Sequence, residues 1–291
     1  MQADQISRLA LGTVQFGMHY GIANAHGQVG ETTAQDILTL AKKSGINTLD
    51  TAIAYGESEA VLGKSDISSF DIVTKLPAIP QSNIGIKNWV TQEFNVSLER
   101  LNVESVDALL VHNIADIIGE NGKQLFDALK DLQNLGKIKK LGWSVYSPAD
   151  LEATPNEMKP DLVQLPFNIF DQRMFTSGWL DKLKENGIEV HARSAFLQGL
   201  LLMQPSERPA YFHEWQDIWN VWDKHTVSSD ALATCLGFSL SKKQIDRVVI
   251  GVDSVAQLQQ ILSIDISDNS YPNLPDTMPE DLINPSRWNA A

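Results

Sequence analysis

The chain alternates between two hydrophobic patterns up to about residue 262. Short apolar runs bounded by polar residues are typical of buried strands. Between them lie longer segments in which apolar residues recur three or four positions apart, as Ala34, Ile37, Leu38 and Ala41 do. This spacing places the apolar side chains on one face of the segment and predicts amphipathic helices.

Eight strand–helix units follow from these patterns. We expect strands over residues 7–17, 47–50, 71–75, 107–112, 140–144, 162–165, 189–192 and 247–250. We expect helices over residues 31–44, 58–63, 86–101, 124–135, 148–153, 180–186, 230–240 and 255–262, with Ser58 as the N-cap of the second. The alternation specifies a parallel sheet, and eight units closing on themselves specify an α/β fold, the (β/α)8 TIM barrel. A doubly wound open sheet fits about as well up to residue 150 and less well beyond it. No linker divides the chain, so we expect one domain over residues 1–291.

Two segments interrupt this regularity. Residues 195–229 are too long for a connecting loop and carry Trp215, Trp219 and Trp222 at helical spacing. We expect an extra helical segment before the last strand–helix unit, which either packs an aromatic face on the barrel or closes as a lid over a substrate. A C-terminal tail rich in Pro, Asn and Asp follows the last helix. Its Trp288 is either a surface anchor or part of a binding pocket.

Composition narrows the function classes. The 291 residues carry a formal net charge of −13. This charge disfavours nucleic acids and anionic membranes as partners, because both attract basic surfaces. No secretion signal is visible, and no apolar run approaches the ~18 residues that cross a membrane. The oligomeric state stays open.

Cys235 is the only cysteine, which excludes an internal disulfide. A reducing compartment is the simpler interpretation, and together with the missing secretion signal it predicts a cytoplasmic protein. The helical setting of Cys235 predicts an inert core position. No HxH, HExxH or CxxC spacing occurs, so we predict no metal site.

Ionisable side chains follow three consecutive predicted strands. Asp50 and Tyr55 come after the second strand, and Lys75 and His112 end the third and fourth. The carboxyl ends of parallel strands meet on one face of such folds, so these groups are expected to share a cleft. A lysine ammonium about 4 Å from a phenol lowers the pKa of the phenol by up to about three units. A tuned proton donor of this kind, with the hydride left to a cofactor, is what carbonyl reduction requires.

The segments LGTVQFG, LDTAIAYGESE, VTKL, LERLNVESVDALLVHN and LGWS, in this order, resemble the aldo-keto reductase superfamily from about Leu9 to Leu258. The resemblance implies an NAD(P)H-dependent aldo-keto reductase that reduces a carbonyl to an alcohol or runs the reverse reaction. Its catalytic groups would be Asp50, Tyr55, Lys75 and His112. Within this set, Tyr55 would give the proton and His112 would orient the substrate oxygen.

The resemblance also implies cofactor contacts on later strands. Ser144 and Gln164 match the positions that hold the nicotinamide carboxamide, although Val145 replaces the asparagine that commonly follows the serine. Arg193 stands where many members have a stacking aromatic residue. We expect it to stack on the nicotinamide, to bind an anionic substrate, or to form a salt bridge in the barrel rim. The residues that contact the cofactor in the same segment would be Ser194 and Phe196.

The adenosine-phosphate contacts are expected after the last strand. Gly251 stands at the position of the usual lysine and Gln257 at that of the usual arginine, while Asp253 adds a negative charge. The cofactor is therefore either NADP, the family default, or NAD. In relatives the loop after the first strand borders the substrate, so His19 and His26, together with Gln15, Phe16 and Tyr20, are candidate contacts. Solvated loop positions are the favoured alternative.

The substrate is expected to be a small carbonyl compound, and a loose likeness to a bacterial subgroup favours a sugar derivative. One alternative from another class is a nucleotide-binding, redox-sensing regulatory subunit with little turnover. Another is a different barrel enzyme, such as a lyase or an epimerase. The structural alternative for the four ionisable groups is an ion-pair network at a barrel mouth.

Overall fold

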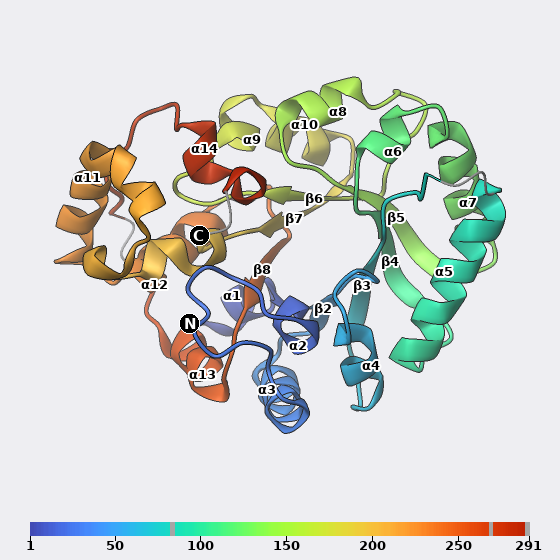
Figure 1. Ribbon diagram of the computed structural model, residues 1–291, viewed down its shortest axis with the longest axis horizontal. Coiled ribbons are helices and arrows are strands. Elements are labelled where there is room, and N and C mark those ends of the chain that lie inside the picture. Colours follow the sequence, from blue (N-terminus) through green and yellow to red (C-terminus); the bar gives the residue numbers. More distant parts are fainter. Residues whose placement is uncertain (82–84, 268–269, 289–291) are drawn as a thin grey trace.

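A computed structural model describes residues 1–81, 85–267 and 270–288 (Figure 1). Eight strands lie in sequence order around a closed barrel, and every neighbouring pair is parallel, including the pair that joins β8 to β1. The strands are β1 (Leu9–Gly12), β2 (Thr48–Asp50), β3 (Asp71–Leu76), β4 (Val106–Val111), β5 (Ile138–Ser144), β6 (Leu162–Pro166), β7 (Glu189–Arg193) and β8 (Arg247–Gly251). The closed ring confirms the (β/α)8 TIM barrel and excludes the open sheet.

Helices surround the ring of strands (Figure 1). The longer ones are α3 (Glu31–Ser44), α5 (Ile86–Leu101), α7 (Gly122–Asn134), α10 (Trp179–Glu185), α11 (Gln216–Thr226), α12 (Ala231–Ser241) and α13 (Val255–Ser263). The short α-helices are α1 (Ala3–Ile6), α2 (Val14–Gly17), α4 (Ser58–Gly63), α6 (Ala115–Ile118), α8 (Pro148–Ala153), α9 (Arg173–Thr176) and α14 (Glu280–Ile283). Four 3₁₀ turns are η1 (Leu197–Leu202), η2 (Pro205–Glu207), η3 (Ala210–Trp215) and η4 (Pro285–Arg287). None of the described helices has the length and hydrophobicity that a membrane crossing requires.

The boundaries of α3 and α5 are those that the pattern predicts, because each helix ends at a residue suited to stop it. Gly45 follows α3 with φ of 93°, and Asn102 follows α5 with φ of 54°. This left-handed conformation turns the backbone out of the helix and lets its last carbonyls find donors. Glycine adopts it without strain and asparagine with little.

The barrel interior is filled by strand side chains. Val73, Ala108, Leu110 and Leu162 are fully buried in one cluster inside the ring. Burial of a side chain the size of leucine contributes about 1.5–3 kcal/mol. Cys235 of α12 is fully buried as well, and burial raises the pKa of its thiol, which confirms the inert core position.

Two local predictions are wrong. The first strand does not run over residues 7–17: β1 ends at Gly12, and the chain turns into the short helix α2. Ser58 is not an N-cap but the first residue of α4. Its hydroxyl is buried and donates to Thr13, 2.8 Å from the Thr13 carbonyl oxygen. The serine therefore fastens α4 to the end of β1 instead of capping its own helix.

The extra segment before β8 contains helix α11, as expected, at the left of Figure 1. Its Trp219 and Trp222 are buried, with ring centres 5.3 and 5.5 Å from that of Phe170. The helix thus packs its aromatic face on the barrel. Trp288 of the tail packs on Phe212 at 4.9 Å and its indole N–H donates to a tail carbonyl. Both observations favour structural anchors.

Candidate active site

The loops and strand ends bring four ionisable residues together, Asp50, Tyr55, Lys75 and His112, which we call the tetrad. Asp50 ends β2, Lys75 lies in β3, and His112 directly follows β4. Tyr55 lies in the turn between β2 and α4. Because β2, β3 and β4 are adjacent parallel strands, their carboxyl ends deliver these side chains to one edge of the barrel.

The carboxylate and the ammonium of the tetrad form a buried ion pair. Lys75 Nζ lies 2.8 and 2.9 Å from the two carboxylate oxygens of Asp50 and 2.7 Å from the Thr51 carbonyl oxygen. The three donors of the ammonium are therefore used. Gln164 also donates its amide to Asp50 at 2.7 Å. A buried ion pair is stable only when such additional hydrogen bonds satisfy it, and this pair meets that condition.

Tyr55 lies beside this pair and beside His112. Lys75 Nζ is 5.1 Å from the centre of the Tyr55 ring, and the ring of His112 meets that of Tyr55 edge-on at 5.7 Å. The ammonium thus acts on the phenol through its field, because none of its N–H groups is left to bond the hydroxyl.

The electrostatics of the tetrad differ from the sequence argument in one respect. Burial, and then the charge of Asp50, raise the pKa of the Tyr55 phenol above its ordinary value. The expectation that Lys75 brings this pKa below its ordinary value is wrong, because burial and the charge of Asp50 raise it. Burial, and then the charge of Lys75, lower the pKa of His112 to about 4. At neutral pH both Tyr55 and His112 are consequently uncharged.

A cavity of about 590 Å³ opens from the tetrad across the mouth of the barrel. This size is within the range of about 300–1,000 Å³ that is usual for sites of small molecules. Nine of the twelve residues singled out from the sequence line it: Asp50, Tyr55, Gln164, Arg193, Ser194, Phe196, Gly251, Asp253 and Gln257. The other three are not among its lining residues: Lys75 and Ser144 are buried, whereas His112 is half-buried. Ser144 is buried and pairs in register with Gln164.

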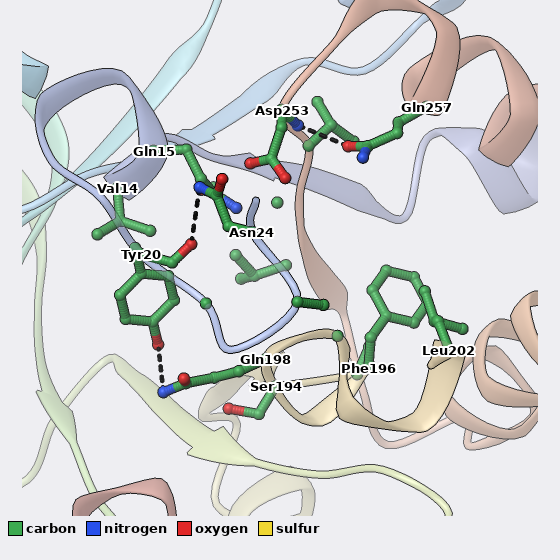
Figure 2. Close-up of a pocket in the computed structure, with 18 of the residues that line it drawn as sticks. Val14, Gln15, Tyr20, Asn24, Ser194, Phe196, Gln198, Leu202, Asp253 and Gln257 are labelled. Carbon is green, nitrogen blue, oxygen red and sulfur yellow. Dashed lines mark hydrogen bonds between the residues drawn. The ribbon is translucent and has the colours of Figure 1, made fainter. Parts of the chain in front are cut away.

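One wall of the cavity is the segment from Ser194 to Met203 (Figure 2). Ser194, Leu197 and Gln198 have φ of 64°, 48° and 55°. Such values cost non-glycine residues free energy and persist where the surrounding structure enforces them, often at functional sites. The Gln198 amide donates to the hydroxyl of Tyr20 at 3.3 Å, across the cavity mouth.

Arg193 ends β7 at the start of this wall. Its guanidinium carbon lies 4.3 Å above the ring centre of Tyr146, and it donates to the Val145 carbonyl oxygen at 3.1 Å. The nearest hydroxyl, that of Ser194, is 3.4 Å away. The salt bridge in the barrel rim that we considered from the sequence is absent among the residues that the structure describes.

The opposite end of the cavity is formed by Gln15, Gly251, Asp253 and Gln257, which we call the distal wall (Figure 2). A Cβ on Gly251 would lie 2.3 Å from the Gln15 amide nitrogen, so the glutamine fills the space where a longer side chain would begin. Gln257 accepts from the Asp253 backbone N–H at 2.6 Å. Its side chain therefore folds back on the start of α13.

Two acceptors at the distal wall have no partner among the described residues. Gln15 Oε1 and Asp253 Oδ1 are buried without a hydrogen bond. An unsatisfied buried acceptor costs about 1–3 kcal/mol. A ligand that brings hydroxyl groups would satisfy both acceptors.

Sequence reasoning did not identify every residue of this cavity. Of the loop residues that it considered as contacts, Gln15 and Tyr20 line the cavity, Phe16 is buried in the core, and His19 and His26 are exposed outside the cavity lining. Residues 21–25 and 199–207 contribute further lining that was not predicted. Their composition carries no chemical signal. The close approach of Gly199 to Ala23, 2.6 Å from a Cβ built on the glycine, is visible only in three dimensions.

Comparisons with known proteins agree with this architecture. A model described as the aldo/keto reductase family matches residues 8–270. The chain is 23% identical to the uncharacterized oxidoreductase YqkF of Bacillus subtilis over 277 residues, 88% of this chain and 86% of that one. It is 27% identical to L-galactose dehydrogenase of Arabidopsis thaliana over 267 residues, 87% and 83% of the two chains. The solved structure of aldo-keto reductase AKR11C1 from Bacillus halodurans superimposes with a TM-score of 0.67 at 21% identity, over 88% and 85%.

Proposed function

The chain belongs to the aldo/keto reductase family, and from this premise we propose that it is an NAD(P)(H)-dependent oxidoreductase in which Tyr55 exchanges a proton with a substrate oxygen. The observation that supports the proposal is the convergence of Tyr55, His112 and the buried Asp50–Lys75 pair at one end of the cavity. When bound, a nicotinamide supplies the hydride that protein side chains lack.

The proton step follows from the charge states of the tetrad. Because the pKa of Tyr55 is raised, the phenol keeps its proton at neutral pH and is a donor when a carbonyl is reduced. His112 is neutral above about pH 4 and has one ring N–H to hold the carbonyl oxygen beside that phenol. As negative charge develops on the oxygen, the ammonium of Lys75, fixed by Asp50, stabilises it.

The cofactor residues are proposed on the same grounds. Gln164 and Ser144 stand next to each other at the ends of β6 and β5, where they would hold the carboxamide of the nicotinamide. Ser194 and Phe196 line the side of the cavity between this point and the distal wall. The two unpartnered acceptors of the distal wall fit the hydroxyl groups of a ribose.

We further propose that NADH is preferred over NADPH. A 2′-phosphate needs cationic partners, and among the described residues no lysine or arginine lines the distal wall. Asp253 would repel the phosphate, whereas its free carboxylate oxygen is a good acceptor for a 2′-hydroxyl. Titration of tryptophan fluorescence with each nucleotide tests this order. Tighter binding of NADPH would refute the preference, and binding of neither would refute the cofactor proposal.

The substrate class is proposed from one relative. L-galactose dehydrogenase is named for a sugar, and the polar mouth formed by Tyr20 and Gln198 suits a hydroxylated compound. A sugar-type carbonyl compound is therefore the first class to assay.

Substitution of the proton donor tests the central proposal. Tyr55→Phe keeps the ring and removes the hydroxyl, so kcat is expected to fall by about 10²- to 10⁴-fold. Binding of NADH should persist, because the ring still closes the cavity. Tyr211→Phe is a matched control, since its hydroxyl bonds the tail carbonyl of Asp281. A Tyr55→Phe protein with full activity would refute the role of Tyr55.

A further inference from the structure

Among the residues that the structure describes, Arg193 pairs with no carboxylate, and it lies where an anion from solution could reach it. The other arginines of the chain do not combine these two features. Arg100, Arg173, Arg208 and Arg287 each pair with a carboxylate. Arg8 and Arg247 form no such pair in the described part of the chain, but Arg8 donates to three backbone carbonyls at 2.7–2.9 Å. Of these arginines, Arg193 is the one that lines the cavity beside Tyr55.

The guanidinium of Arg193 is held in place yet keeps free donors. The ring of Tyr146 covers one of its faces at 4.3 Å, which fixes its plane. Its hydrogen bonds to the Val145 carbonyl and the Ser194 hydroxyl, at 3.1 and 3.4 Å, occupy two of its five N–H groups. The remaining donors are preorganised in a planar fork of the kind that binds carboxylate and phosphate oxygens.

An unpaired cation in a partly enclosed site is costly unless a ligand neutralises it. The chain carries 36 acidic against 23 basic residues, so carboxylates were available to pair with Arg193. The charge also acts where the reaction is proposed to occur. The Arg193 guanidinium lowers the pKa of both Tyr55 and His112; burial opposes and outweighs this effect at Tyr55 and adds to it at His112.

We infer that Arg193 binds an oxyanion group of the substrate, a carboxylate or a phosphate, and so selects carbonyl compounds that carry such a group near the reacting carbon. The inference rests on the proposed function and narrows its substrate class. The tetrad acts on the carbonyl, and Arg193 positions the molecule by its charged end. The Tyr146 stack makes the guanidinium a rigid anchor rather than a mobile one.

Matched substrate pairs test the inference on the wild-type protein. Succinic semialdehyde is compared with butanal for a carboxylate, and glyceraldehyde 3-phosphate with glyceraldehyde for a phosphate. Hydrogen bonds to charged groups predict that kcat/KM favours the anionic member of at least one pair by about 10- to 100-fold. The pair that shows the preference identifies the oxyanion. A ratio near one in both pairs would overturn the inference.

Three variants assign the preference to Arg193. In Arg193→Gln the ratio of kcat/KM within the preferred pair should fall to about one, whereas Arg193→Lys should keep part of it. Using a ratio removes any general effect of the substitution on turnover. Arg287→Gln removes the same charge from the exposed tail and should leave the ratio unchanged. An unchanged ratio in Arg193→Gln, or a loss confined to NADH affinity, would assign the guanidinium to another role.

Failure of the proposed function is distinguishable from failure of this inference. If no aldehyde is reduced with either nucleotide, the reductase proposal fails, and calorimetry with succinate then tests the anion site directly. Binding that Arg193→Gln abolishes and Arg193→Lys retains would still support the anion site. Absence of succinate binding to the wild-type protein would overturn it.

Discussion

The two ends of the cavity differ in whether their buried polar groups have hydrogen-bond partners. At the tetrad, Asp50 and Lys75 satisfy each other, and Gln164 and Thr51 satisfy the rest of their hydrogen bonds. At the distal wall, acceptors of Gln15 and Asp253 are buried without partners. A preorganised group needs no rearrangement when charge develops in a reaction. The tetrad is therefore preorganised in the folded chain, whereas the distal wall has acceptors that a ligand could satisfy.

The largest effect is expected from breaking the tetrad. Lys75→Met leaves the carboxylate of Asp50 buried without its counter-ion, which should cost about 3–5 kcal/mol in the free energy of unfolding and abolish turnover. Urea denaturation at pH 7 measures the first effect. Lys42→Met is the control, because its pair with Asp66 is exposed and is worth about 1 kcal/mol or less. Equal losses in the two variants would show that the buried pair is no more important than a surface one.

The second prediction concerns the effect of His112 on stability at low pH. Above pH 6.5 His112 is uncharged in both the folded and the unfolded state. Below that value His112 binds a proton in the unfolded state but not in the folded state, where its pKa is about 4. His112 therefore reduces the free energy of unfolding as the pH falls from 6.5 to about 4, by up to about 3 kcal/mol.

Denaturation curves at pH 7, 6, 5 and 4 measure this dependence. His112→Gln should lose less stability on acidification than the wild type does, and the difference should be complete near pH 4. Curves for the two proteins that stay parallel over this range would contradict the lowered pKa and, with it, the neutral state of His112 on which the proton step relies.

The smallest effect is expected at the distal wall. Gln257→Arg places a cation beside the proposed position of the 2′-phosphate, so the ratio of the NADH and NADPH dissociation constants should move about 10-fold toward NADPH. Fluorescence titration measures the ratio. Gln92→Arg adds the same charge on the exposed face of α5 and should not change it. No movement in Gln257→Arg would remove this residue from the nucleotide site.

Most of the barrel could be predicted because its signals are local. The helices α3, α5 and α8 have the predicted limits, since amphipathic spacing and terminating residues lie within the segment itself. The tetrad followed from the same logic, because strand ends meet on one face of a parallel barrel. The short helix α2 was missed, since residues 14–17 continue the apolar pattern of β1.

The rest of the site depends on contacts between distant segments. The pKa of Tyr55 is raised by burial and by the charge of Asp50, and both depend on how the folded chain packs around the phenol. The stack of Arg193 on Tyr146 joins the ends of β7 and β5, 47 positions apart by number. The placement of the Gln15 amide against Gly251 likewise joins α2 to β8. No periodicity in the sequence predicts these contacts between distant segments.

The closure of the ring also determines when the site can exist during synthesis. Leu9 of β1 pairs with Val248 of β8, so the first strand leaves the ribosome with one edge that has no neighbour until roughly 240 further residues have followed. At about 5–20 residues per second this wait lasts from about ten seconds to most of a minute. Throughout that interval β1 presents an unpaired edge on which other chains could add. Pairing with β8 therefore removes the exposed edge of β1 as well as closing the barrel.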